Sequence, residues 1–332
     1  MQHLMRYYFQ LPLFLRLLST VFVLMISFGI VIHMIEPDNF PTVFDGIWWA
    51  FVTGATVGYG DYVPLSTAGK VTAILLILSG GGLVTFYMAT LSAATVKHER
   101  DLSKGKVNYK GKDHILIIGW NERTRQLIEM MTENQCHESI VLIDRSMKQL
   151  YENHSNVHFI HGDATLEDTL EKANTSESKL AIVTADPSKS EHAADQSVIH
   201  QIVSLKGHNS KLFIIAEVLT EKQKINAERA GADRVIRSND FMSTLFYHEL
   251  YHTDPIEPFD LLLKLLTSRQ FHEEAIPPGY NDRFLSDAIQ FYLKKGTIVI
   301  GYRYNKKLYF SLDPSTPLKN VQTLILLIPL RP

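Results

Sequence analysis

The stretch Thr56-Val57-Gly58-Tyr59-Gly60-Asp61 decides the fold of the first third of this 332-residue chain. Gly58 and Gly60 can adopt positive φ without the clash that a Cβ atom would cause. Successive carbonyl groups can then point to the same side of an extended loop. A ring of such oxygens replaces the hydration shell of a bare cation. Gly-x-Gly alone is typical of an ordinary turn, so its surroundings decide between the two interpretations.

Apolar segments of membrane length lie on both sides of this loop. Ranges 17–35 and 71–96 carry no formal charge and have the length of ~20 residues or more that a bilayer crossing requires. The range 42–54 is too short to span and suits a re-entrant half-helix, whose C-terminal end favours a cation. We predict that Trp48 and Trp49 in this half-helix support the loop.

Three consecutive glycines, Gly80, Gly81 and Gly82, lie in the middle of the second span. Each destabilises a helix by roughly 1 kcal/mol relative to alanine in a soluble protein, so their presence calls for a reason. One interpretation is a gating hinge. The other is close packing against the half-helix, because small residues let helix backbones approach. Both interpretations stay open.

Basic residues predict the orientation of the spans. Arg6 and Arg16 precede the first span, and several lysines follow Lys97, whereas the stretch between Arg16 and Lys70 contains no lysine or arginine. Cytoplasmic loops carry the excess of basic residues. We therefore expect a multi-pass protein of the cell membrane with both termini in the cytoplasm, in contact with lipid.

The overall composition narrows the choice of partners. The net charge is −2 at pH 7, which gives no basic face for a nucleic acid. Cys136 is the only cysteine, so the chain can form neither an internal disulfide nor a cysteine-rich metal cluster. The length leaves room for about two domains at ~100–200 residues each.

Residues 12–97 resemble the pore of the two-transmembrane-helix potassium channels. The resemblance rests on Trp48-Trp49 followed by Thr56 to Asp61 at the spacing of that family. It implies that these six residues form a K⁺ selectivity filter at the centre of a homotetramer. Some relatives carry a glutamate at the position of Val52 that can bond the filter aspartate, and Asp61 here lacks that partner.

Beyond residue 112 the pattern changes to short apolar runs that alternate with amphipathic stretches. The runs predicted as strands are 114–119, 139–144, 157–161, 180–184, 211–216 and 234–236. Strands that alternate with helices indicate βαβ units and a parallel, Rossmann-like sheet. The C-terminal part adds predicted strands at 297–302, 307–311 and 323–328.

The first turn of this sheet is where a nucleotide would bind. Its sequence, Gly119 to Thr124, keeps only the first glycine of the dinucleotide pattern Gly-x-Gly-x-x-Gly. Asn121 blocks the close approach of a pyrophosphate, and Glu122 repels it. Asp144 follows the second strand, either as a ribose-binding acid or as the cap of the next helix. We expect no NAD cofactor, while an adenine nucleotide stays open.

Residues 113–250 resemble an RCK domain, the regulator of K⁺ conductance in channels of the MthK type. The matching motifs are Gly119-Trp120, residues 161–165 (HGDAT), Ile215-Ala216-Glu217 and residues 230–233 (AGAD). The resemblance implies a ring of RCK domains, with extra soluble copies as a further option. It divides the chain into a pore domain (1–97), a linker (98–112), a Rossmann-like lobe (113–238), a crossover helix (239–254) and a small α+β lobe (255–332).

The resemblance also suggests two ligand sites. The nucleotide candidates are Gly119, Asn121, Asp144 and Asp163. In calcium-gated relatives carboxylates bind Ca²⁺, and the corresponding residues are Glu217 and Asp186, although Leu219 replaces the second acid of the motif. Calcium prefers six to eight oxygen ligands, so one missing carboxylate weakens such a site. Glu217 as an ordinary surface charge is the alternative.

The sequence therefore predicts a K⁺-selective tetrameric channel, not an enzyme, that opens or closes when a ligand binds its cytoplasmic RCK ring. A membrane-anchored NAD-dependent oxidoreductase would explain the Rossmann pattern but not the filter. A poorly selective ligand-gated cation channel would share the architecture but normally alters Gly-Tyr-Gly.

Overall fold

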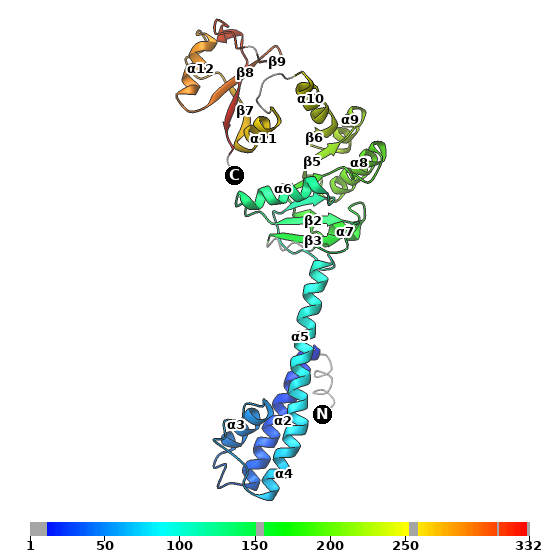
Figure 1. The fold of residues 1–332 in the computed structure, drawn as a ribbon, viewed down its shortest axis with the longest axis vertical. Coiled ribbons are helices and arrows are strands. Elements are labelled where there is room, and N and C mark those ends of the chain that lie inside the picture. Colours follow the sequence, from blue (N-terminus) through cyan, green and yellow to red (C-terminus); the bar gives the residue numbers. More distant parts are fainter. Residues whose placement is uncertain (1–11, 151–155, 252–257, 311, 331–332) are drawn as a thin grey trace. The chain divides into compact units, whose positions relative to one another are not determined.

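The computed structural model describes residues 12–150, 156–251, 258–310 and 312–330. The chain forms two compact units that divide at Val107 (Figure 1). Arg6, used above to orient the spans, and the first residues of the predicted C-terminal lobe lie outside the described residues.

The first unit contains the two predicted membrane spans. Helix α2 (Leu13–Ile35) is the outer span, and α3 (Val43–Gly54) is the short half-helix. The inner span runs from Thr67 to Ser103 as α4 (Thr67–Leu76), the π-helical turn η1 (Ile77–Gly81) and α5 (Gly82–Ser103). Both spans are long and apolar enough to cross a membrane.

The inner span is longer than the uncharged run that predicted it. Residues 98–103, expected to belong to a linker, continue α5 as helix. No glycine or proline interrupts this stretch before Gly105, whose φ of +65° ends the helix geometry. Charged residues prolong the helix beyond the apolar segment because helix propensity does not depend on hydrophobicity.

Glycines let α2 and α3 pack against each other. A Cβ atom on Gly29 would lie 2.5 Å from the Cα atom of Ile47, and one on Gly46 would overlap the carbonyl oxygen of Gly29. Any side chain at these positions would push the two helices apart. The core of the unit consists of the buried side chains Val21, Met25, Ile32, Phe40, Trp49, Ala50 and Leu76.

Glu36 connects the end of the outer span to the start of the inner span. Its carboxylate, in a side chain only 7% exposed, accepts hydrogen bonds from the amides of Leu65 and Ser66 at 3.0 and 2.8 Å and from Asn39 Nδ2 at 2.9 Å. The hydroxyl of Ser66 donates a further bond. A Cβ atom on Gly69 would overlap this carboxylate, so glycine makes room for it.

The second unit begins with the parallel sheet predicted from the sequence. Its strands are β1 (Ile115–Ile118), β2 (Ile140–Asp144), β3 (Val157–His161), β4 (Leu180–Val183), β5 (Phe213–Val218) and β6 (Arg234–Arg237). Their order, β3-β2-β1-β4-β5-β6, is that of a Rossmann fold, with the order reversing between β1 and β4. The helices are α6 (Glu122–Glu133), α7 (Glu167–Lys172), α8 (Glu191–His208) and α9 (Glu221–Ala230).

Helix α10 (Ser238–Leu250) follows β6 at the position of the predicted crossover helix. The elements after it form the small α+β lobe, in which α11 (Pro258–Ser268) precedes a four-stranded antiparallel sheet in the order β7-β10-β8-β9. Its strands are β7 (Arg269–Ala275), β8 (Ile298–Tyr304), β9 (Lys307–Tyr309) and β10 (Thr323–Pro329), and α12 (Leu285–Leu293) packs on β8. The sequence analysis missed β7, which has only one strongly apolar side chain, Phe271, before its last residue.

We predict that Glu36→Gln lowers the stability of the detergent-solubilised protein at pH 7 by about 1–3 kcal/mol, the usual worth of hydrogen bonds to a charged group. Burial alone would raise the pKa of Glu36, but bonds from Ser66, Asn39 and Leu65 outweigh it and lower the pKa to about 2 from 4.5. This stabilisation is complete above the unfolded pKa and is lost as the pH falls through about 2. Melting curves recorded between neutral pH and about 2 should therefore converge for the two proteins.

The matched control is Asp38→Asn, which changes an exposed carboxylate close to Glu36 in the sequence. It should leave the melting temperature unchanged across the same range. A gap between Glu36→Gln and the native protein that stays constant down to the lowest pH would contradict the proposed ionised clamp.

Candidate functional site

The loop after α3 has the alternating backbone that aligned carbonyl groups require. Gly58 and Gly60 have φ of +62° and +77°, as predicted. Thr56 also has a positive φ, +59°, which is rare for a β-branched residue and costs conformational energy. The amides of Val57 and Gly58 donate to the carbonyl oxygen of Val52 at 2.9 and 3.3 Å. The end of the half-helix thus holds the strained start of the loop.

Trp48 supports the outer end of this loop. Its indole Nε1 donates to Asp61 Oδ2 at 2.7 Å, and its ring stacks on Tyr59 with centroids 6.0 Å apart and planes at 6°. The aspartate therefore has a partner even though Val52 replaces the glutamate of some relatives. Trp49, predicted to support the loop as well, is buried in the core with its edge toward Phe40.

The sequence analysis missed a second support, in which Asp45 takes part. Thr42 and Asp45 form a capping box at the start of α3, and Tyr62 donates to Asp45 Oδ1 at 2.9 Å. The loop end is thereby bonded to the first turn of the half-helix. The pattern Thr-x-x-Asp before an apolar run is the sequence signal that indicates such a cap.

The glycines at 80–82 differ in their surroundings. Gly80 is buried in the π-helical turn, and a Cβ atom there would lie 3.0 Å from both Leu76 Cδ1 and Met25 Cε. Within the chain, Cβ atoms on Gly81 and Gly82 would meet no atom within 4 Å. These nearest neighbours of Gly80 come from the outer span and from the inner span itself, and not from the half-helix against which close packing was expected. The π-helical turn is a local irregularity of the kind that occurs at functional sites, and the gating hinge stays a prediction.

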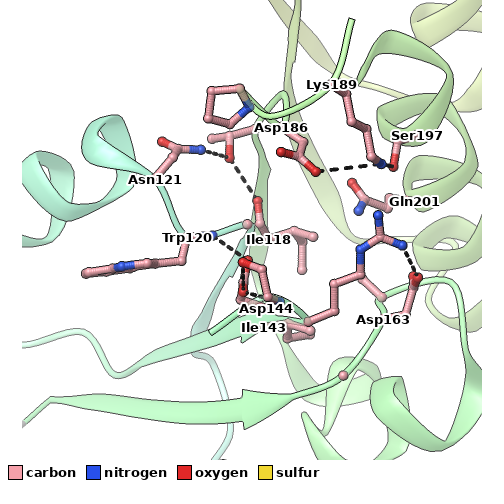
Figure 2. Close-up of a pocket in the computed structure, with 17 residues that line it drawn as sticks. Ile118, Trp120, Asn121, Ile143, Asp144, Asp163, Asp186, Lys189, Ser197 and Gln201 are labelled. Atoms are coloured by element: carbon pink, nitrogen blue, oxygen red, sulfur yellow. Dashed lines mark hydrogen bonds and ion pairs between the residues drawn. The ribbon is translucent and has the colours of Figure 1, made fainter. Parts of the chain in front are cut away.

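The second unit has a cleft at the carboxyl ends of β1, β2 and β4 (Figure 2). It is open-sided, and its volume is about 560 Å³ with the part that is open to solvent. Four predicted nucleotide candidates and one predicted calcium candidate line it: Gly119, Asn121, Asp144, Asp163 and Asp186. The cleft lies where the strand order reverses, which is where ligands bind in open α/β sheets.

Two of these residues are engaged in holding the loops. Asn121 accepts a bond from the Thr124 amide as the N-cap of α6 and donates to Thr184 Oγ1 at 2.9 Å. Its φ of −155° is extended rather than left-handed. Asp144 accepts bonds from the Trp120, Ser146 and Met147 amides and from the Ser146 hydroxyl. Both side chains therefore serve the local fold. Asp144 caps no helix in the described residues between β2 and β3, and instead holds the turn that follows β2.

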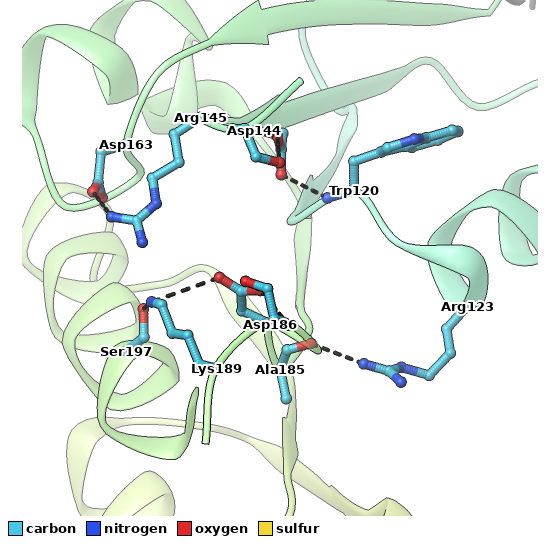
Figure 3. A network of polar contacts seen from close by, with 11 residues as sticks. Trp120, Arg123, Asp144, Arg145, Asp163, Ala185, Asp186, Lys189 and Ser197 are labelled. Carbon is cyan, nitrogen blue, oxygen red and sulfur yellow. Dashed lines mark hydrogen bonds and ion pairs between the residues drawn. The ribbon is translucent and has the colours of Figure 1, made fainter. Parts of the chain in front are cut away.

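Two cations that line the cleft form ion pairs, one between the loops after β2 and β3 and one within the loop after β4 (Figure 3). Arg145 Nη1 lies 3.2 Å from Asp163 Oδ2, and Lys189 Nζ lies 3.7 Å from Asp186 Oδ2 and 3.0 Å from Ser197 Oγ. Burial alone would raise the pKa of Asp163, but bonds from Thr165 and the Arg145 guanidinium lower it. The sequence analysis did not single out these cations, although both follow the ends of predicted strands.

Glu217 lies beside this cleft and forms an ion pair with Arg123. Its side chain is buried, and its Oε2 accepts the Ala185 amide at 2.9 Å and lies 3.2 Å from Arg123 Nε. Its Oε1 is buried without a hydrogen-bond partner. Glu217 is thus no ordinary surface charge. Among the described residues, no group of three or more His, Cys, Asp or Glu could hold a metal ion, so the calcium site stays a prediction.

Family models match both units. Residues 20–97 match the ion channel model, and residues 115–238 match the TrkA-N domain. Each match covers the part of the chain that carries one of the two candidate sites.

Known potassium channels resemble the chain over part or nearly all of its length. YugO of Bacillus subtilis, which is assigned as a potassium channel protein, is 39% identical over 315 residues, 94% of either chain. The calcium-gated potassium channel TvoK of Thermoplasma volcanium is 34% identical over 61% of this chain and 58% of its own. The structure of the GsuK channel bound to NAD has the same fold, with a TM-score of 0.52 at 16% identity; the match covers 94% of this chain and 56% of GsuK.

We predict that Trp48→Phe shortens the periods of steady conduction. Phenylalanine keeps the ring that stacks on Tyr59 but loses the indole N–H, so Asp61 loses a bond worth about 1.5–3 kcal/mol. Single-channel recording in planar bilayers with symmetrical KCl should show conducting bursts that are at least several-fold shorter. Trp49→Phe tests the core position, where no described bond to the loop is lost, and should leave burst length within about twofold. Unchanged bursts in Trp48→Phe would show that the bond does not hold the loop.

Proposed function

The chain belongs to the potassium channels that join an ion-channel pore to a TrkA-N domain, and we propose that an adenine nucleotide bound in the cleft controls this pore. The observation that carries the proposal is the ion pair Arg145–Asp163, which joins the loop after β2 to the loop after β3. A second cation of the cleft, Lys189, pairs with Asp186 within the loop after β4. A phosphate that competes for Arg145 would release the loops after β2 and β3 from each other, and Lys189 would give it a second positive charge.

The pore itself conducts K⁺, and membership in this family excludes the oxidoreductase alternative. Residues 56–61 supply the carbonyl oxygens that replace the hydration shell of the ion. Four copies around one axis complete the filter in our proposal, with both termini in the cytoplasm and the TrkA-N domains in a ring. Soluble copies of the domain could enter the same ring.

The proposed nucleotide does not bind as a dinucleotide does in a typical Rossmann fold. Asn121 occupies the N-terminal turn of α6, where a pyrophosphate would lie, and Asp144 already accepts four hydrogen bonds. Arg145 and Lys189 are the cations within the cleft that a phosphate can bind instead. We therefore propose a mononucleotide with its phosphates on these two residues, in preference to NAD, which GsuK binds.

Ligand control follows from the exchange of partners. Asp163 and Asp186 are ionised, since hydrogen bonds and the nearby cations lower the pKa of each. Binding a phosphate leaves these carboxylates without their cations, so the loops after β2 and β3 lose the ion pair that joins them. A ligand shifts gating only by its differential affinity for the two states, typically about 1–3 kcal/mol per coupled site.

The test measures binding of ATP, ADP and NAD to the purified full-length channel by calorimetry and their effect on open probability in planar bilayers. Arg145→Gln should weaken mononucleotide binding by about 10–100-fold, the loss of one charge-assisted contact of roughly 1.5–3 kcal/mol. Asp163→Asn should instead tighten binding several-fold, because it frees Arg145 from its competing carboxylate. If the two substitutions change nucleotide affinity in opposite directions, the phosphate takes the place of the Asp163 carboxylate on Arg145.

The matched control is Arg125→Gln, which removes an arginine that pairs with Glu122 and Glu129 on α6 and does not line the cleft. It should leave nucleotide affinity unchanged. Equal weakening by Arg145→Gln and Asp163→Asn would contradict the exchange. A Ca²⁺ response that Glu217→Gln abolishes, with no nucleotide response, would replace the proposal by a calcium site like the one that the name of TvoK indicates.

A further inference from the structure

We infer that Met25 of the outer span couples the π-helical turn of the inner span to the last turn of the half-helix before the filter. Met25 is 1% exposed and lies in the core of the first unit. Its end is enclosed by two glycines from two different elements, Gly54 of α3 and Gly80 of η1. The inference concerns the pore alone and does not depend on which ligand acts on the second unit.

The contact between Met25 and Gly54 is linked to the filter by backbone hydrogen bonds of the last turn of α3. A Cβ atom on Gly54 would lie 2.8 Å from Met25 Sδ and closer still to Cε, so the thioether fills the space above this glycine. Gly54 is the last residue of α3. In the same turn the carbonyl oxygens of Val52 and Thr53 accept the amides of Val57 and Thr56. Displacing this turn therefore displaces the amides that begin the filter.

The contact with Gly80 reaches the irregular turn of the inner span. A Cβ atom on Gly80 would lie 3.0 Å from Met25 Cε, whereas positions 81 and 82 have open space within the chain. A π-helical turn holds more residues than an α-helical turn, so its conversion to α-helix changes the position of the residues within it. Gly80 would then move relative to the methyl group of Met25.

One methyl group thus fills the space at two glycines, where an added Cβ atom would lie 3.0 Å or less from it. Interiors are close-packed, so a shift of Gly80 toward α2 moves the methyl group toward Gly54, and a shift away leaves a void. Methionine suits this position because its unbranched chain has three rotatable bonds. All three residues are buried within a single chain, so the contact does not need a neighbouring subunit. Met25 is therefore a positioning residue between the π-helical turn of the inner span and the filter.

The test is a double-mutant cycle on the full-length channel in planar bilayers, with open probability as the gate readout and the K⁺/Na⁺ permeability ratio as the filter readout. Gly80→Ala places a methyl group against Met25 and should lower the permeability ratio several-fold. In the Met25→Ala background, where Leu76 Cδ1 is the remaining neighbour at 3.0 Å from the added methyl group, Gly80→Ala should leave the ratio within about twofold. An equal drop in both backgrounds would overturn the inference.

The reciprocal variant keeps the inference testable if Gly80→Ala does not assemble. The methyl group of Gly54→Ala would contact the same Met25 side chain from the half-helix. Because coupling between sites is reciprocal, Gly54→Ala should change the open probability when Met25 is present and should not change it in the Met25→Ala background. Met34→Ala, a change on the same helix at a side chain that is 74% exposed, is the control and should not remove either effect. Persistence of the Gly54→Ala effect without Met25 would also overturn the inference.

Discussion

The proposed selectivity filter of this channel depends on a backbone conformation that the chain would not adopt by itself. Three positive φ values alternate through Thr56, Gly58 and Gly60, and the one at Thr56 is costly for a β-branched residue. Such a conformation persists only where the surroundings over-determine it. In the first unit, Val52, Thr53 and Trp48 of the half-helix bond to this loop directly.

These contacts act at three levels around the loop. The carbonyl oxygen of Val52 holds the first filter amides, and Trp48 holds Asp61 at the far end. Behind them, the Asp45–Tyr62 bond and the Glu36 clamp join the segments that flank the loop. Met25 then fills the space between the half-helix and the inner span. A side chain far from the ion can therefore influence conduction, since it helps to hold a strained backbone.

The cleft of the second unit follows a different principle. Its charged side chains are matched in pairs, Arg145 with Asp163 and Lys189 with Asp186, while Asp144 is used to hold a loop. A matched pair stabilises the unliganded arrangement only modestly, because partly exposed ion pairs are worth about 0–1 kcal/mol. A ligand that exchanges such partners can move loops at little cost. Weak ion pairs that a ligand can exchange suit a regulatory site better than a site that holds a cofactor tightly.

The sequence by itself determined the elements that depend on local patterns. Uninterrupted apolar runs predicted both spans, Gly-Tyr-Gly predicted the positive φ values at Gly58 and Gly60, and alternating strands and helices predicted the Rossmann order. It missed the strand β7, whose polar side chains join a sheet by pairing with β10, because that pairing depends on a contact between distant segments.

Only the tertiary structure decided which charges meet. Glu217 was expected at a calcium site or on the surface, but it lies buried beside Arg123, which comes from a helix almost a hundred residues earlier. The pairing of Arg145 with Asp163 and the enclosure of Met25 by Gly54 and Gly80 likewise depend on how loops and helices from different parts of the chain come together. Periodicity describes which face of an element is buried, whereas the partner of a given side chain is set by the packing of the whole unit.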